Sequence, residues 1–241
     1  MSQENKTFIY FAPHQDDELL TYGIDIAMAV KNGYDVHIVL CTDGASSNVR
    51  LRLGNREFCT QCGEQHVFDL TREDFTATRD QEFFGSTDAL GVKRENLHLA
   101  EKRIVDGQIT LENAKALMRE YIDRYGEDCT VGTMYPNPPE IQHKDHRTLG
   151  LAAQELKEEG VIKHLRLMEE PYVAIIAEHS PDDEPIRIVA TDDITEQIAK
   201  AVESYFLWDP KNKRYAVGFH SVPREMEQLK TEKALYLHIY D

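Results

Sequence analysis

A strand-like run that ends directly in a cluster of metal-binding side chains constrains this sequence more than any other feature. Residues 8–11 form a short apolar, β-prone run, and a pattern with helical spacing begins at Leu19. One histidine and three consecutive carboxylates lie between them, in the segment A-P-H-Q-D-D-E. The pattern predicts a strand, a loop and a helix. His14, Asp16 and Asp17 are then expected at the carboxyl end of a parallel strand, where open α/β sheets bind ligands.

A second cluster of the same kind lies much further along the chain. It reads H-K-D-H over residues 143–146, and it follows an apolar, strand-like run at 129–134 and a loop with three prolines at 135–139. Proline restricts the backbone, so this loop is expected to help hold the two histidines in place. The second cluster is therefore also expected at a strand-to-helix junction.

Together the two clusters predict a metal site. Three nitrogen or oxygen ligands with an open fourth position suit a catalytic zinc ion, and His14, Asp17 and His146 can supply them. Asp16 is expected beside the metal without binding it, because adjacent residues cannot easily aim both carboxylates at one ion. A solvated acidic loop at either cluster is the alternative interpretation.

The two motifs resemble those of the LmbE-like (PIG-L) family of zinc-dependent N-acetylglucosaminyl deacetylases, which carry H-P-D-D-E near the N-terminus and H-x-D-H later. This chain has H-Q-D-D-E, with Gln15 where proline is usual, and the resemblance covers roughly residues 7–160. It implies a Rossmann-like α/β fold with a doubly wound, mostly parallel sheet. It also implies a metal-dependent enzyme that hydrolyses the amide bond of an N-acyl amino sugar or its conjugate.

The resemblance also implies a role for each residue of the motifs. Three side chains bind zinc, or another divalent transition metal in its place: His14, Asp17 and His146. Asp16 is the general base that acts on zinc-bound water, and His143 stabilises the oxyanion. Asp145 is expected to orient His143, in the way that carboxylates commonly fix an imidazole near a metal.

Four further side chains are candidates for substrate contact: Asp43, Ser46, Arg79 and His220. The first two lie in a polar turn that resembles the family's cleft-lining loop, and a plain turn is the alternative. Arg79 opens an R-x-x-E pattern like that of the family, with a surface or helix-pairing arginine as the alternative. His220 is a candidate because distant relatives place a C-terminal side chain over the cleft; packing within its own segment is the alternative.

The remainder of the chain alternates between strand-like and helical patterns up to about residue 160, which predicts a doubly wound sheet. Helices are expected at 18–31, 111–125 and 149–159, and, after an N-cap signature at Thr191, from there to about Phe206. C-terminal strands are expected at 165–168, 172–177 and 186–190. The whole chain, 1–241, is interpreted as one domain, with its core at about 7–160 and C-terminal strands and a helix at 161–241.

Residues 48–78 lose clear periodicity and are interpreted as an insertion beside the cleft. Cys59 and Cys62 have the spacing of a zinc knuckle or a redox pair, but no second C-x-x-C completes a four-sulfur site. His66 lies close to them in the sequence. Free thiols in a reducing compartment are the default interpretation, and a structural or redox role is the alternative.

Charge and length limit the partners of the protein. The 241 residues include 43 acids and 27 bases, for a net charge of −16, whereas nucleic acids and anionic membranes require clustered Lys and Arg. No apolar run approaches the roughly 20 residues of a membrane span, and the N-terminal residues lack a signal-peptide core. We therefore expect a cytoplasmic protein with a small-molecule substrate and leave open whether it forms a homo-oligomer.

Two other functions would use similar residues. A metal-dependent phosphoesterase usually requires a second ion or a basic phosphate clamp, and only scattered arginines are present. A non-catalytic module that binds amino sugars is the other alternative. A dinucleotide site is disfavoured, because no G-x-G-x-x-G follows the first strand.

Overall fold

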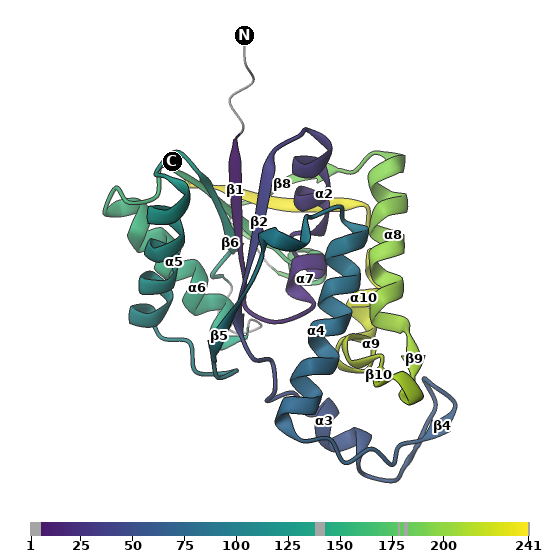
Figure 1. Ribbon diagram of the computed structural model, residues 1–241. Helices are drawn as coiled ribbons and strands as arrows, with labels where there is room; N and C mark the ends of the chain where they lie inside the picture. The colour runs from purple at the N-terminus through teal and green to yellow at the C-terminus, as the bar shows by residue number, and fades with distance from the viewer. Residues whose placement is uncertain (1–5, 138–142, 178, 181–182, 241) are drawn as a thin grey trace.

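The structure, a computed structural model, describes residues 6–137, 143–177, 179–180 and 183–240. Its main sheet consists of β1 (Thr7–Ala12), β2 (Asp35–Thr42), β5 (Leu97–Ile104), β6 (Thr130–Met134), β7 (His164–Glu169), β8 (Ile186–Val189) and β11 (Ala234–Ile239). These seven strands lie in the order β5-β2-β1-β6-β7-β11-β8 (Figure 1). The first five are parallel, and β11 runs antiparallel to both β7 and β8. The predicted doubly wound, mostly parallel α/β fold is confirmed.

The helices and the smaller elements connect or cover these strands. The longer helices are α2 (Gly23–Lys31), α4 (Arg72–Ala89), α5 (Leu111–Tyr125), α6 (Lys144–Glu158) and α8 (Asp192–Phe206). The short helices are α1 (Asp17–Leu20), α3 (Val49–Leu53), α7 (Pro171–Ile176), α9 (Val217–Ser221), α10 (Pro223–Leu229), η1 (Arg94–Asn96) and η2 (Pro210–Asn212). Two hairpins pair β3 (Phe58–Cys59) with β4 (Glu64–Gln65), and β9 (Trp208–Asp209) with β10 (Arg214–Tyr215).

Strand β1 lies in the interior of the sheet and is buried on both faces. Tyr10 and Ala12 belong to the apolar cluster that includes side chains of α2 and α8, whereas Ile9 and Phe11 belong to the cluster that includes α5 and α6. Figure 1 shows these two pairs of helices on opposite faces of the sheet. Successive side chains of a strand point to opposite faces, so a continuous apolar run is what a strand covered on both sides requires. The loop after β1 therefore starts from a rigid position.

Several sequence-based boundaries require correction. The strand predicted at 172–177 is wrong, because residues 172–176 belong to helix α7, which begins at Pro171. Proline at the first position of a helix has a suitable φ and lacks an N–H that would have no partner there, and this local signal outweighs the β-branched residues that follow. The helix predicted at 18–31 is divided into α1 and α2 at Tyr22. Part of the predicted proline-rich loop, residues 138–139, lies outside the described residues.

The insertion predicted at 48–78 contains more regular structure than its sequence suggested. It forms α3, the β3–β4 hairpin and the first turns of α4. The hydroxyl of Thr71 accepts a hydrogen bond from the Asp74 N–H at 3.0 Å, so α4 starts with a side-chain N-cap. Leu53 and Phe75 pack with Tyr215 in a small apolar cluster. The insertion therefore packs against the C-terminal part of the chain.

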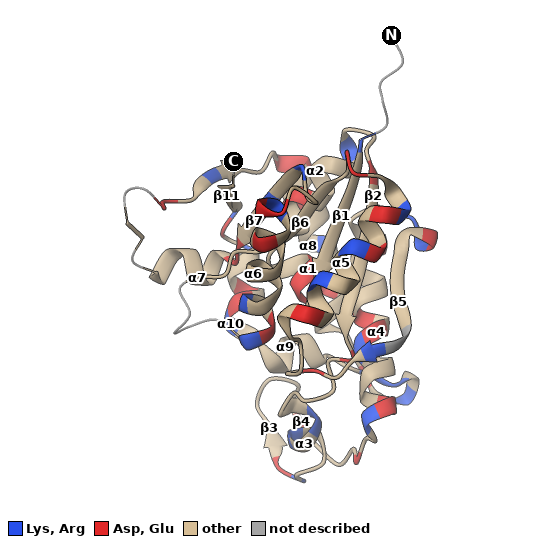
Figure 2. Cartoon of the chain, turned by 90° about the vertical axis from the view of Figure 1, so that its left-hand side faces the viewer, with Lys and Arg blue, Asp and Glu red and all other residues tan. Residues whose placement is uncertain are grey.

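Acidic and basic side chains are mixed over the outer surface. Figure 2 shows Lys and Arg interspersed with Asp and Glu along α5. Exposed pairs such as Arg124 and Glu120, at 2.9 Å, link the two signs within that helix. Among the described residues, no helix combines the length and the apolar character that crossing a bilayer requires.

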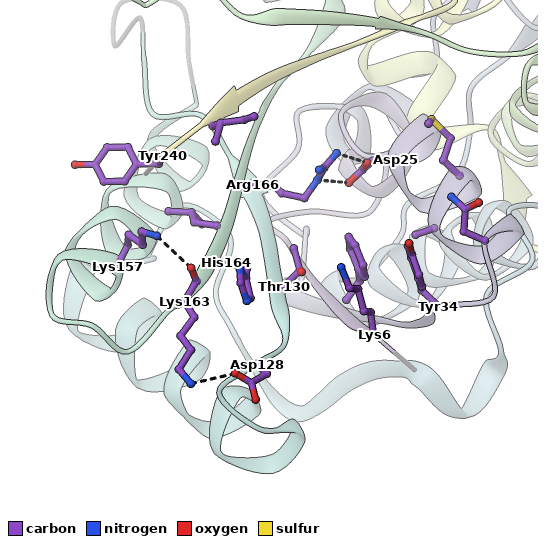
Figure 3. Close-up of a pocket in the computed structure, with 16 residues that line it drawn as sticks. Lys6, Asp25, Tyr34, Asp128, Thr130, Lys157, Lys163, His164, Arg166 and Tyr240 are labelled. Carbon is purple, nitrogen blue, oxygen red and sulfur yellow. Dashed lines mark hydrogen bonds and ion pairs between the residues drawn. The ribbon is translucent and has the colours of Figure 1, made fainter. Parts of the chain in front are cut away.

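A cavity of about 500 Å³ opens at the amino-terminal edge of the sheet, beside Lys6, Thr130 and His164. Its main buried acid, Asp25, is engaged on both oxygens by the Arg166 guanidinium, at 3.0 and 2.6 Å (Figure 3). The hydroxyl of Tyr10 also donates to Asp25, at 2.8 Å. The buried acid at this edge is therefore already paired with Arg166, whereas the two sequence motifs lie at the opposite edge.

Candidate active site

The carboxyl ends of the parallel strands bring the two motifs together. His14 and Asp17 follow β1, and His146 lies in the first turn of α6, which comes after β6. Because β1 and β6 are neighbours and parallel, their following segments leave the sheet at the same edge. The structure therefore brings together the three side chains that were predicted to bind a metal.

The three candidate ligand atoms form a small triangle. His14 Nδ1 lies 3.2 Å from His146 Nε2, and Asp17 Oδ2 lies 3.2 Å from each of these nitrogens. Ligands at about 2.0–2.2 Å from a tetrahedral zinc ion are separated from each other by about 3.4 Å. The donor set and its spacing thus fit one such ion, with room for a fourth ligand from solvent or substrate.

Two carboxylates lie next to His14 on its other side. His14 Nε2 lies 3.2 Å from Asp106 Oδ1 and 3.4 Å from Asp145 Oδ2. A carboxylate at one ring nitrogen fixes the proton there and leaves the other nitrogen free for a metal. The Asp145 carboxylate also accepts N–H bonds from Gly107 at 2.7 Å and Ile109 at 3.2 Å. Its contacts therefore lie with His14 and the loop after β5.

His143 is held by the backbone of the same motif. It is the N-cap of α6, and its Nδ1 accepts a hydrogen bond from the Asp145 N–H at 3.2 Å. Its ring centre lies 4.7 Å from that of His14 and 5.4 Å from that of His146. Partial burial and then these two neighbouring imidazoles lower the pKa of His143. The Asp145 side chain was expected to orient His143, but it is the Asp145 backbone that contacts the ring.

Asp16 lies beside the ligand triangle and is paired with Arg79. One Asp16 oxygen accepts a hydrogen bond from the Arg79 guanidinium at 3.0 Å, and Arg79 also donates to the carbonyls of Gly44, at 2.8 Å, and Gln15. Asp16 has a φ of 121°, an uncommon conformation for a residue with a side chain. Burial raises the pKa of Asp16 to about 6, although the Arg79 charge opposes the increase.

The loop with glutamine in place of the family's proline is fixed by side-chain bonds. The Gln15 amide donates to the Asp80 carboxylate at 2.7 Å and to the Asp43 carbonyl at 3.4 Å. The neighbouring Gly44 has a φ of +62°, and a Cβ there would lie 2.0 Å from the Gln15 amide oxygen. Glycine at this position therefore allows the second loop to approach the first.

A pocket of about 390 Å³ lies above the triangle. Besides the ligands, Asp16 and His143, it is lined by polar side chains that include Ser46, Arg79, Glu170 and Ser221. Two candidate substrate contacts lie elsewhere. The Asp43 carboxylate accepts the Asp106 N–H at 3.0 Å and thus joins two loops, and His220 lines a separate pocket together with Cys59.

Sequence reasoning did not identify Asp106 or Glu170 as functional. Each of them lies just beyond the end of a parallel strand, Asp106 after β5 and Glu170 after β7. Burial, followed by the charge of Asp17, raises the pKa of Glu170 to about 8, so this pocket-lining carboxyl can donate a hydrogen bond at neutral pH. Acids directly after strands were the available signal.

Asp106→Asn is expected to weaken metal binding at this site about tenfold to a hundredfold, because an amide replaces the carboxylate that fixes His14. The measurement is metal affinity by competition with a chelator. Asp123→Asn, an exposed acid on α5, is the matched control. An unchanged affinity in Asp106→Asn would show that Asp106 does not position His14.

The chain is similar to one protein family in sequence and to several solved structures in fold. The sequence profile of the PIG-L family, described as GlcNAc-PI de-N-acetylase, matches residues 9–157. A search of curated protein sequences found no match. The solved structure of the A40926 pseudoaglycone deacetylase Dbv21 is 18% identical, with 99% of each chain covered and a TM-score of 0.64.

Two further solved structures have similar scores. N,N'-diacetylchitobiose deacetylase from Pyrococcus horikoshii is 17% identical, over 99% of this chain and 85% of that one, with a TM-score of 0.62. The 4-carboxy-2-hydroxymuconate hydratase GalB from Pseudomonas putida KT2440 is 17% identical, over 97% and 95%, with a TM-score of 0.60. At these identities the likeness shows a shared fold, and the fold occurs in a hydratase as well as in deacetylases.

The family assignment rests on the sequence profile. Its match covers more than half of the chain and includes both motifs, from the segment after β1 to the H-K-D-H at the start of α6. The family expected from these motifs is thereby confirmed. The chain belongs to the PIG-L family of de-N-acetylases and is a hydrolase of the deacetylase type.

Proposed function

We propose that this protein is a zinc-dependent N-deacylase that removes an acetyl or other acyl group from an N-acylated amino sugar or its conjugate. One observation carries the proposal: three ligand atoms lie 3.2 Å apart from each other, and the carboxylate of Asp16, which is not part of this triangle, lines the same pocket. A metal with an adjacent free base is the arrangement that amide hydrolysis by water requires.

The charges around the triangle support a bound cation. The carboxylates of Asp17, Asp106 and Asp145 surround His14, and the one lysine or arginine that lines the pocket in the described residues, Arg79, is already paired with Asp16. Two imidazoles and one carboxylate, with an open position, are typical ligands of catalytic zinc. When bound, zinc would lower the pKa of a water molecule and polarise the acyl carbonyl.

Asp16 is the proposed general base. Its pKa of about 6 leaves it mostly ionised at neutral pH, yet makes it more basic than an ordinary aspartate. The pair with Arg79 holds one of its oxygens, at 3.0 Å. The carboxylate would take a proton from the attacking water and pass it to the departing amine, so that one residue serves in both steps.

His143 is the proposed donor to the oxyanion. Its Nδ1 accepts the Asp145 N–H, which places the proton of the neutral ring on Nε2. Because its pKa is lowered, the ring is neutral at neutral pH. Its Nε2–H can therefore donate a hydrogen bond to the oxyanion. A positioned donor of this kind stabilises the negative charge that develops on the acyl oxygen.

His143→Ala is expected to reduce turnover about a hundredfold to a thousandfold and to leave metal content unchanged, because one oxyanion donor is lost and no ligand is. Steady-state kinetics and metal analysis of the same preparation measure both effects. Lys144→Ala, next to His143 and exposed, is the control. A wild-type rate in His143→Ala would remove this residue from the mechanism.

The pocket lining supports a neutral, hydroxyl-rich substrate. Ser46, Asn48 and Ser221 offer hydroxyl and amide groups, and Glu170 offers a carboxyl group that can donate. Such groups match the hydroxyls of a sugar ring. A phosphoester is a poorer match, since phosphate recognition requires unpaired basic side chains and Arg79 is engaged by Asp16.

The proposal is tested by incubating the zinc-loaded protein with a panel of N-acyl amino-sugar conjugates and measuring free amine and free acid. Equal amounts of amine and acid are expected from at least one conjugate. Asp16→Asn protein prepared in parallel controls for contaminating hydrolases. Release of phosphate from generic phosphoesters without amine formation would favour a phosphoesterase, and binding of the sugars without release of either product would favour a binding module.

A further inference from the structure

Two thiols and two imidazoles lie together at a distance from the catalytic residues. Cys59 ends β3, Cys62 lies in the following turn and His66 follows β4, whereas His220 comes from α9 near the other end of the chain. Their ligand atoms all lie within 4.8 Å of one another. Figure 1 shows this hairpin region beside β9 and β10, below the lower end of the main sheet.

The spacing of these atoms matches a tetrahedral metal site. Cys62 Sγ lies 3.2 Å from His66 Nε2, and Cys59 Sγ lies 3.5 Å from His220 Nε2. With zinc–sulfur bonds of about 2.3 Å and zinc–nitrogen bonds of about 2.0–2.1 Å, sulfur and nitrogen ligands are about 3.6 Å apart. Two sulfurs and two nitrogens would fill all four positions of zinc, so such a site has none left for substrate.

The backbone orients both imidazoles toward the sulfurs. His66 Nδ1 lies 3.3 Å from the Arg52 carbonyl oxygen, and His220 Nδ1 lies 2.8 Å from the Ala216 carbonyl oxygen. Donation from Nδ1–H to a carbonyl places the lone pair on Nε2, which is the tautomer that a metal ligand needs. Two histidines from separate parts of the chain thus both have Nδ1 next to a backbone carbonyl and Nε2 facing a sulfur, as expected for two ligands of one metal ion.

The turn that contains Cys62 is closed by Gly63 and holds the two cysteines close together. The Gly63 N–H donates to the Cys59 carbonyl at 2.9 Å, and Gly63 has a φ of +73°. A residue with a side chain rarely adopts this conformation, so glycine closes the turn at little cost. The turn brings Cys59 and Cys62 close enough together to share one ion.

The hairpin has little else to stabilise it. Each of its strands contains two residues, and Phe58 is 67% exposed. The nearby apolar cluster around Leu53 and Phe75, as far as it is described, includes no residue of β3 or β4. An isolated hairpin of this size is at best marginally stable in water, and small units without a core commonly depend on a metal or a disulfide.

We propose a structural zinc site whose four ligands are Cys59, Cys62, His66 and His220. The C-x-x-C lacks a second C-x-x-C in the sequence, and the fold supplies the two remaining ligands as histidines. The ion joins the hairpin to α9, and the last residue of α9, Ser221, and the next residue, Val222, line the active-site pocket. The site thus stabilises one side of that pocket and takes no part in the chemistry.

The test uses the full-length protein with cobalt in place of zinc. Thiolate ligands of Co²⁺ produce a charge-transfer absorption in the near ultraviolet, and the His14 site contains no thiolate, so the band reports only the proposed site. We expect the band in the wild-type protein and in His14→Ala, and its loss in Cys62→Ser. Zinc content is expected to be two ions per chain in the wild type and one in either variant.

Cys129→Ser, which removes a thiol just before β6, is the matched control and should keep both the band and two zinc ions. A second measurement needs no variant: titration of wild-type thiols with a mercurial reagent should release one zinc ion per chain. A wild-type protein without the charge-transfer band would overturn the proposal. So would a Cys59–Cys62 disulfide, found by mass spectrometry, in protein purified under reducing conditions.

Discussion

Replacing His14 with alanine is expected to remove the catalytic metal and to abolish hydrolysis at the same time. His14 Nδ1 is one corner of the ligand triangle, and its Nε2 is the group that faces Asp106 and Asp145. Without the imidazole, Asp17 and His146 remain as two ligands, and the carboxylates of Asp106 and Asp145 each lose one of their contacts. Metal analysis should show one ion per chain fewer than in the wild type, and amine release should fall to the rate without enzyme.

The control for this prediction is His164→Ala, which removes an exposed imidazole at the opposite edge of the sheet. It should retain metal and activity. Circular dichroism of both variants distinguishes loss of the ion from loss of the fold. Retained hydrolysis in a folded His14→Ala protein would refute the ligand set, and the zinc-dependent mechanism with it.

Asp16→Asn is expected to keep its metal while turnover falls by about a hundredfold to ten-thousandfold, the usual contribution of a general base. The amide preserves the size of the side chain but cannot accept the proton of the attacking water. Asp17→Asn is the matched comparison, because Asp17 Oδ2 is a corner of the triangle and its loss should release the metal. Kinetics and metal content are measured on the same preparations. If Asp16→Asn protein also lacks metal, the roles assigned to the two aspartates are wrong.

The pH dependence of the reaction follows from the same carboxylate. Burial raises the pKa of Asp16 to about 6, and a bound cation nearby would lower it again. Asp16 must be ionised to act as a base, so kcat/KM should fall as the pH drops below this pKa, with the acid limb at or below about pH 6. The residual activity of Asp16→Asn should lack that limb. A wild-type profile with an acid limb well above pH 6 would point to a different base.

The placement of the two motifs could be predicted from the sequence because it depends on local rules. An apolar run such as Ile9–Phe11 forms a strand buried on both faces, and the carboxyl ends of parallel strands meet at one edge. His14 and His146 therefore approach each other once the two strands lie side by side in the sheet, as β1 and β6 do. The helix predicted after Thr191 is also present, as α8, although the Thr191 side chain makes no capping hydrogen bond.

Other parts of the structure were not accessible in this way. The strand predicted at 172–177 failed because β-branched residues in a short segment are ambiguous, and packing of α7 against α10 and β11 adds to the local signal of Pro171. Asp145 was expected to contact its neighbour in sequence, His143. Its carboxylate instead contacts His14 and the loop after β5, because the turn of α6 directs it into the interior of the site.

The sequence by itself determined the family, the fold class and the three candidate ligands, because each depends on residues close together in the chain or on the order of strands and helices. Only the tertiary structure decided which groups surround them. Asp106 and Glu170 enter the site because β5 and β7 end at the same edge as β1. His220 lies with Cys59 because α9 packs against the insertion. Contacts between distant segments depend on how whole elements pack together, and no local pattern encodes that.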